Sequence, residues 1–188
     1  MINQIQLTER IIIYELAKEV NASDMHYKVK EKINQKLDCT LLVVCAENII
    51  LCQEKILQCL TFKGTMEREW IMDSSIRYIR ATGGPSKKEG LLVGLKNGQI
   101  LQIFINNPFP INIIKLSDPI RCLDMSMLRQ KVAVVDDKGF CSVYDIKSKQ
   151  LLYQVINMLI TKQIDTKVFF ERNPMQIVLH GTHNLKKC

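Results

Sequence analysis

Two histidines stand close together near the end of the sequence. His180 and His183 are separated by two residues and Cys188 follows, and this combination of imidazole and thiolate groups can hold zinc. A structural zinc site also needs a fourth ligand and second-shell groups that orient the imidazoles, and neither is evident here. We therefore expect these histidines to lie in a surface turn, and we expect no metal site.

Three of the seven cysteines recur at a fixed interval. Cys45, Cys52 and Cys59 are seven residues apart, which would place three thiols on one face of a helix. They lie, however, among short apolar runs typical of strands, and the sequence contains no Cys-x-x-Cys pair. We therefore expect these cysteines to act as small apolar residues in strands, with most of the thiols reduced.

A glycine-rich stretch spans residues 83–90 and contains Ser86 followed by two lysines. It lacks the Gly-Lys-Ser/Thr ending of a phosphate-binding loop and the Gly-x-Ser-x-Gly spacing of a nucleophile elbow. Glycine and proline mark connections far more often than phosphate sites, so we expect a flexible connection.

The adjacent carboxylates Asp136 and Asp137 form the remaining candidate for chemistry. In a hairpin turn, aspartates accept local backbone hydrogen bonds, and neighbours in a strand point apart, so the two are not expected to share a proton. Nothing in the sequence combines a nucleophile, a base and an oxyanion site. The sequence therefore predicts a protein without enzymatic activity, catalytic residues or cofactors.

Composition predicts one folded unit. The chain has 188 residues, of which 47% are hydrophobic, 24% charged and 6% aromatic. No apolar run approaches the roughly 20 residues that span a bilayer, so no transmembrane segment is expected. The first ten residues lack the features of a signal peptide, which favours the cytosol.

The formal charge of +7 raises the alternative that the protein binds nucleic acid. Residues 156–188 account for +3 and the remainder for +4, and no basic block is interleaved with aromatic residues. This scatter favours a solvated surface, so no nucleic-acid partner is expected. A basic protein that binds nucleic acid is kept as the alternative function.

The elements that must position these residues follow a repeat. Four short polar turns are centred on Glu9, Glu54, Asn97 and Lys138, so successive centres are 45, 43 and 41 residues apart. Each turn separates two β-rich runs and so predicts a hairpin, with Asn97-Gly98 favouring a type I′ turn. The interval is typical of the four-stranded blades of WD40 β-propellers.

Further runs complete three of these units. Inner strands are predicted at residues 39–45, 76–81 and 120–125, and outer strands at 67–72, 111–116 and 150–155. Residues 15–22 have poor helical spacing and are predicted as a loop. The fold class is therefore all-β: a partial WD40-type propeller of about four four-stranded blades that form an open arc.

The domain assignment places the partial propeller at residues 1–155. Residues 156–188 are a divergent or aberrant tail, or part of a further blade with strands at 167–170 and 175–179.

Several long peptides resemble one protein family. They are residues 5–16 with 23–33, residues 41–46 with 49–55, residues 90–101, and residues 121–126 with 132–136. Over about residues 4–155, they resemble the WD-repeat family of intraflagellar transport protein 122 homologues, within the second of that family's two propellers.

The resemblance implies a non-catalytic scaffold of intraflagellar transport complex A, acting in retrograde ciliary transport, ciliary protein trafficking and cilium assembly. The implied partners are other complex A subunits and adaptors for ciliary membrane-protein cargo. The implied locations are the cilium, its basal body, the cytoskeleton and the cytoplasm.

Overall fold

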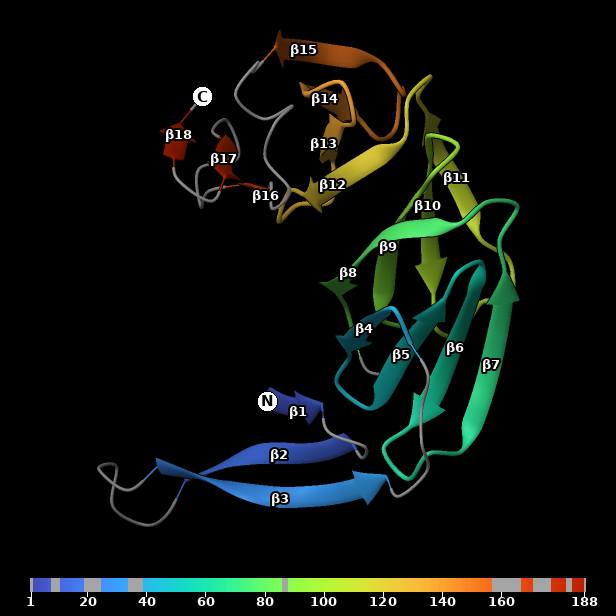
Figure 1. The fold of residues 1–188 in the computed structure, drawn as a ribbon, viewed down its shortest axis with the longest axis vertical. Coiled ribbons are helices and arrows are strands. Elements are labelled where there is room, and N and C mark those ends of the chain that lie inside the picture. The colour runs from blue at the N-terminus through green and yellow to red at the C-terminus, as the bar shows by residue number, and fades with distance from the viewer. Residues whose placement is uncertain are drawn as a thin grey trace.

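The computed structural model describes residues 2–7, 11–18, 25–33, 39–85, 88–156, 167–170, 177–181 and 184–187. Within these residues every regular element is a β-strand, and the strands form five antiparallel sheets. Figure 1 shows the sheets following one another around an open arc, which confirms the all-β, partial-propeller prediction. No helix in the described part of the chain is long and apolar enough to cross a membrane.

Three sheets contain four strands each, in simple up-and-down order. The second sheet consists of β4 (Leu41–Val44), β5 (Asn48–Gln53), β6 (Ile56–Thr61) and β7 (Met66–Ile71). The third consists of β8 (Ile76–Gly83), β9 (Gly90–Leu95), β10 (Gln99–Phe104) and β11 (Ile111–Lys115). The fourth consists of β12 (Ile120–Met125), β13 (Lys131–Asp136), β14 (Phe140–Asp145) and β15 (Leu151–Ile156).

The first sheet has three described strands, β1 (Ile2–Leu7), β2 (Ile11–Lys18) and β3 (Met25–Ile33). Leu7 pairs with Ile11, so the hairpin predicted around Glu9 forms, although Glu9 itself lies outside the described residues. The prediction of a loop over residues 15–22 is wrong for residues 15–18, because these continue β2 and pair with β3. Antiparallel pairing on both sides outweighs the weak local pattern there.

The last sheet consists of β16 (Lys167–Phe170), β17 (Ile177–Gly181) and β18 (Asn184–Lys187). Val168 of β16 packs against Cys122, Ala133 and Val135 of the fourth sheet. The described strands of residues 156–188 therefore form a sheet stacked on the preceding one. Whether the domain boundary lies at residue 155 stays a prediction.

The turn at Asn97-Gly98 differs from the predicted type I′ turn. Gly98 has a φ of +84°, but Asn97 is not among the residues with positive φ. The Gly98 amide donates to the Leu95 carbonyl at 3.1 Å, and Leu95 and Gln99 flank a three-residue loop. This is the pattern of a type I turn followed by a left-handed glycine, and the same pattern recurs at Gly139, with a φ of +85°.

The core lies between neighbouring sheets. One buried cluster joins Leu57, Cys59 and Trp70 of the second sheet to Leu91 and Val93 of the third. A second cluster joins the third sheet to the fourth in the same way. Strands such as β9, where all six residues are buried, are apolar on both faces because a sheet covers each face.

Candidate interaction site

His180, His183 and Cys188, which are expected to bind no metal, lie only partly within the described residues. His180 lies in β17, where it pairs with Lys167 and Leu185, so the expectation of a surface turn is wrong for this residue. Its side chain, together with His183 and Cys188, lies outside the described residues. Among the described residues, no three His, Cys, Asp or Glu side chains are grouped closely enough to hold a metal ion.

The cysteines spaced by seven residues lie in or beside strands, as predicted. Cys45, Cys52 and Cys59 are buried and unbridged. Burial, reinforced by the nearby Glu89 carboxylate, raises the pKa of Cys45 to about 12. Burial and the nearby Glu67 raise the pKa of Cys59 to about 11. These thiols are therefore protonated at neutral pH and are poor nucleophiles.

The two adjacent aspartates point apart, as predicted, but only Asp136 has the predicted local role. Its Oδ1 accepts a hydrogen bond from the Phe140 amide at 2.9 Å. Burial raises the pKa of Asp136, and the backbone hydrogen bonds of its turn oppose that shift. Asp137 instead forms ion pairs with Arg77 at 3.3 Å and Arg121 at 3.5 Å.

Both arginines sit at the same irregularity of two successive inner strands. The register of β8 shifts between Ile76 and Tyr78, and that of β12 shifts between Ile120 and Cys122, which makes Arg77 and Arg121 the extra residues. A β-bulge redirects the side chain that it carries. Here it brings two guanidinium groups from neighbouring sheets to one carboxylate, which links the third and fourth sheets.

The glycine-rich stretch connects β8 to β9, and Ser86 lies outside the described residues. Sequence reasoning missed Glu89 at its end, which is buried although it is charged. Its carboxylate accepts a hydrogen bond from the Ala46 amide at 2.8 Å, and its carbonyl accepts one from the Ile105 amide at 3.0 Å. This residue therefore ties the third sheet to the second.

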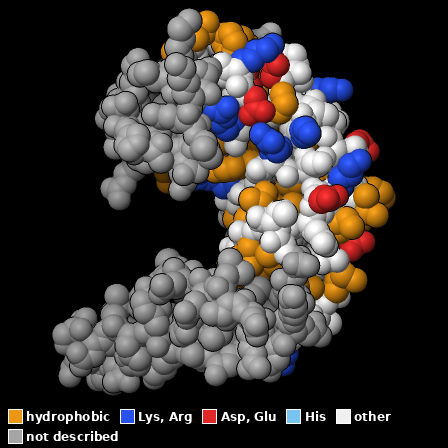
Figure 2. All heavy atoms as spheres, in the orientation of Figure 1, with side chains coloured by type: hydrophobic (Ala, Val, Ile, Leu, Met, Phe, Trp, Pro, Cys, Tyr) orange, Lys and Arg blue, Asp and Glu red, His pale blue; other side chains and the backbone are white. Residues whose placement is uncertain are grey.

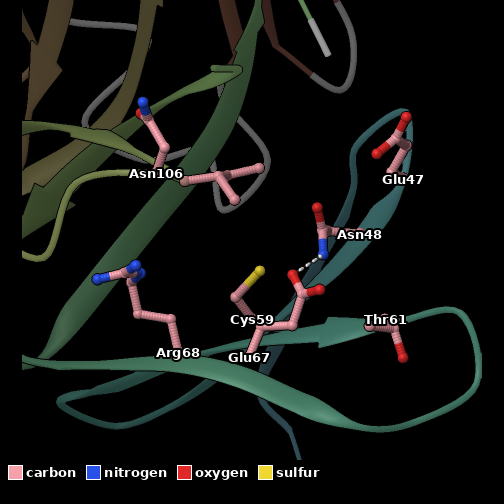
Figure 3. A pocket seen from close by; sticks show the side chains of 8 residues that line it. Glu47, Asn48, Cys59, Thr61, Glu67, Arg68 and Asn106 are labelled. Atoms are coloured by element: carbon pink, nitrogen blue, oxygen red, sulfur yellow. Dashed lines mark hydrogen bonds between the residues drawn. The ribbon is translucent and has the colours of Figure 1, made fainter. Parts of the chain in front are cut away.

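One cavity in the described residues lies between the second and third sheets. Its volume is about 570 Å³, within the range of about 300–1,000 Å³ for small-ligand sites. It is lined by Glu47, Asn48, Cys59, Thr61, Glu67, Arg68, Ile105 and Asn106. Figure 3 shows Glu47, Asn48 and Glu67 on one side of it and Arg68 and Asn106 on the other.

A buried amide fixes one carboxylate of this cavity. Asn48 is 4% exposed, and its Nδ2 donates to Glu67 Oε2 at 2.7 Å and to the Leu60 carbonyl at 3.4 Å. Asn48 and Glu67 are 19 residues apart, and only the pairing of β5, β6 and β7 brings them together. The sequence analysis did not identify either residue. The only local signal for each was a polar side chain next to a run of apolar residues.

The cavity is equipped for binding. It offers two carboxylates, one guanidinium and two amides, whereas its only thiol is protonated. The lining also includes the Thr61 hydroxyl, and it contains no histidine, serine or lysine.

Comparison with known proteins places most of the chain in one sequence family. A family model described as the IFT122 second beta-propeller matches residues 3–164. The "Intraflagellar transport protein 122 homolog" of Homo sapiens is 62% identical over 153 residues, which cover 81% of this chain and 12% of that protein. The homologues of Mus musculus and Xenopus tropicalis are each 61% identical over 153 residues, covering 81% of this chain and 13% of theirs. The chain thus spans about an eighth of the length of these relatives.

Proposed function

The chain belongs to the IFT122 second beta-propeller family, and from that premise we propose that it is a non-catalytic WD-repeat scaffold of intraflagellar transport complex A. It holds other subunits of that complex and adaptors for ciliary membrane proteins. It does so in the cilium, at the basal body and the cytoskeleton, and in the cytoplasm. Through these contacts it serves retrograde transport, ciliary protein trafficking and cilium assembly.

The match over residues 3–164 to a propeller of a transport protein carries this proposal. The stacked sheets support it, because radial stacking makes a rigid body with broad faces for partners. The charged and amide groups that line the cavity between the second and third sheets also suit a binding role.

Deletion of residues 3–164 from the protein in a ciliated cell tests the scaffold role. We expect impaired assembly of complex A and accumulation of cargo in the cilium, measured by co-purification of subunits and by imaging. Normal complexes and normal cilia after the deletion would contradict the proposal.

A single buried substitution gives a finer version of this test. Val134 in β13 is buried, so Val134→Asp places an unpaired carboxylate in the core, at a cost of about 4 kcal/mol or more. We expect this variant to reproduce the deletion. Gln150→Asp adds the same charge at an exposed turn of the same sheet and should leave assembly intact. His180→Ala with His183→Ala should also leave it intact, because we assign these residues no ligand role.

The alternative is a basic propeller that binds nucleic acid. Several arginine and lysine side chains are already paired with carboxylates: Arg77 and Arg121 with Asp137, Arg80 with Asp124 at 3.0 Å, and Lys138 with Asp118 at 3.0 Å. These pairs leave fewer positive charges for phosphates. Binding to a mixed-sequence RNA that weakens steeply with salt would favour the alternative, and salt-insensitive association with transport subunits would favour the scaffold.

A further inference from the structure

The cavity between the second and third sheets separates its charges. Its acidic side consists of Glu47 in the β4–β5 connection and Glu67 in β7, and its other side carries Arg68 and Asn106 (Figure 3). With two carboxylates and one guanidinium, the lining has a formal charge of −1 in a chain whose formal charge is +7. This local reversal of sign distinguishes the cavity from the protein as a whole.

The acidic side is preorganised. Glu67 is held by the amide of Asn48, which is itself fixed by the Leu60 carbonyl and almost fully buried. A carboxylate that is already oriented loses little side-chain entropy when a cation reaches it. A guanidinium or ammonium group that reaches Glu67 would form charge-assisted hydrogen bonds with its carboxylate, and Glu47 adds negative charge on the same side of the cavity.

The opposite side suits a polypeptide backbone. The Arg68 guanidinium and the Asn106 amide are hydrogen-bond donors, and the carbonyl groups that flank a side chain are acceptors. Ile105 and Cys59 supply an apolar floor on which the methylene stem of a lysine or arginine can lie. The two sides therefore match the two ends of one basic residue within an extended segment.

We propose that this cavity binds a basic side chain, lysine or arginine, from a partner polypeptide. The cationic head lies against Glu67, on the side of the cavity that also carries Glu47, and the partner's peptide carbonyls face Arg68 and Asn106. This deepens the proposed function, on which it rests, by naming the chemistry of the partner.

Short peptides test the cavity separately from the complex. The 188-residue chain, labelled with ¹⁵N, is titrated with acetyl-Gly-Arg-Gly-amide and followed by NMR. We expect saturable shifts at Asn48, Glu67 and Asn106, with a Kd on the order of 1 mM, as befits one anchoring residue. The same peptide with citrulline in place of arginine keeps the shape but removes the charge, and it should bind about tenfold more weakly.

Two variants of the same strand form a matched pair. Glu67→Gln keeps an acceptor for Asn48 and should weaken binding of the arginine peptide about tenfold. Glu69→Gln makes the same change in charge at an exposed position that contacts Gln58 and does not line the cavity, so it should leave the Kd within about twofold. Thermal unfolding of both variants checks that the fold is retained.

Three results would overturn the proposal even if the arginine peptide binds. They are equal binding of the citrulline peptide, equal weakening by Glu67→Gln and Glu69→Gln, or tighter binding of acetyl-Gly-Glu-Gly-amide, which would mean that Arg68 selects an anion. If the peptides fail to bind while Val134→Asp still disrupts the complex, the cavity proposal is wrong and the scaffold proposal stands. If the peptides bind while deletion of residues 3–164 leaves complexes and cilia normal, the scaffold proposal is wrong.

Discussion

The outer strands β7 and β15 occupy the same place in two sheets but differ in burial. Trp70 of β7 pairs with the second residue of β6, and Val155 of β15 pairs with the second residue of β14. Trp70 is 2% exposed and Val155 is 37% exposed, while Ile114, the corresponding residue of β11, is 8% exposed. The same position is therefore buried in the second and third sheets and exposed in the fourth.

The neighbouring sheet explains the difference. Trp70 packs within a cluster that includes Leu101 and Ile103 of β10, and its Nε1 donates to the Asn107 carbonyl at 3.1 Å. The third strand and the following connection of the next sheet thus cover the outer strand of the sheet before it. On the fourth sheet, Val168 packs near the inner strands, and all six residues of β15 are exposed.

Composition differs as well. β7 carries Glu67, Arg68 and Glu69, whereas β15 reads Leu-Leu-Tyr-Gln-Val-Ile and carries no charge. Charged side chains on an edge strand discourage pairing with other chains, and an exposed apolar edge favours it. Figure 2 shows charged side chains interspersed with hydrophobic ones along the outside of the arc.

The largest expected effect contrasts Trp70 with Val155. Trp70→Ala empties a filled site between two sheets and removes the hydrogen bond to Asn107, so it should cost about 3–5 kcal/mol. Val155→Ala removes side-chain atoms that already contact water and should cost less than about 1 kcal/mol. Urea unfolding of both variants measures the difference, and equal losses would contradict the contrast in burial.

The next effect contrasts two glycines with positive φ. A Cβ at Gly98 would lie 2.3 Å from the Leu116 carbonyl oxygen, in the chain that leaves β11, whereas a Cβ at Gly83 would meet nothing within 4 Å. Gly98→Ala should cost about 2–4 kcal/mol, because backbone strain and a clash add together. Gly83→Ala should cost only the strain of about 1 kcal/mol. A Gly98→Ala variant as stable as Gly83→Ala would contradict the expected clash and would show that the backbone at Leu116 can move away from the new Cβ atom.

Alkaline pH should lower the free energy of unfolding through the cysteines that are buried between the sheets. Burial raises the pKa of Cys122 to about 12 and that of Cys59 to about 11, from an ordinary value of 9.0. These thiols stay protonated in the folded chain while they ionise in the unfolded chain. Their contribution is therefore complete below pH 9 and is lost as the pH rises from 9 toward 11–12. Free energies of unfolding at pH 8 and pH 10.5 should differ less in Cys59→Val than in the parent chain, and an unchanged difference would contradict this assignment.

The smallest expected effect on stability concerns the edge of β15. Val155→Lys places a charge at an exposed position and should change the free energy of unfolding by less than about 0.5 kcal/mol. It should nevertheless reduce self-association, because a charge on an edge strand opposes pairing between chains. Light scattering against concentration measures this. Arg68→Lys keeps the charge of β7 and should leave association unchanged.

The sequence by itself determined the strands of the second, third and fourth sheets and their order, whereas it missed β3 and β18. The alternation within short runs and the polar turns at intervals of 45, 43 and 41 residues are properties of the local sequence. They can therefore be recognised without knowing which sheets pack against each other. The wrong turn type at Asn97 also has a local cause. Asn-Gly suits both a two-residue type I′ turn and a type I turn followed by a left-handed glycine, and the strand pairing, which leaves three residues in the loop, selects the second.

Only the tertiary structure decided which faces are buried and where a ligand can sit. The contact of Trp70 with Asn107 joins residues 37 apart, that of Glu89 with Ala46 joins residues 43 apart, and that of Arg77 with Asp137 joins residues 60 apart. The cavity lined by Asn48, Glu67 and Asn106 likewise needs two sheets side by side. The physical reason is that stacking between sheets depends on their separation and relative orientation, which the alternation and turns within one sheet leave open.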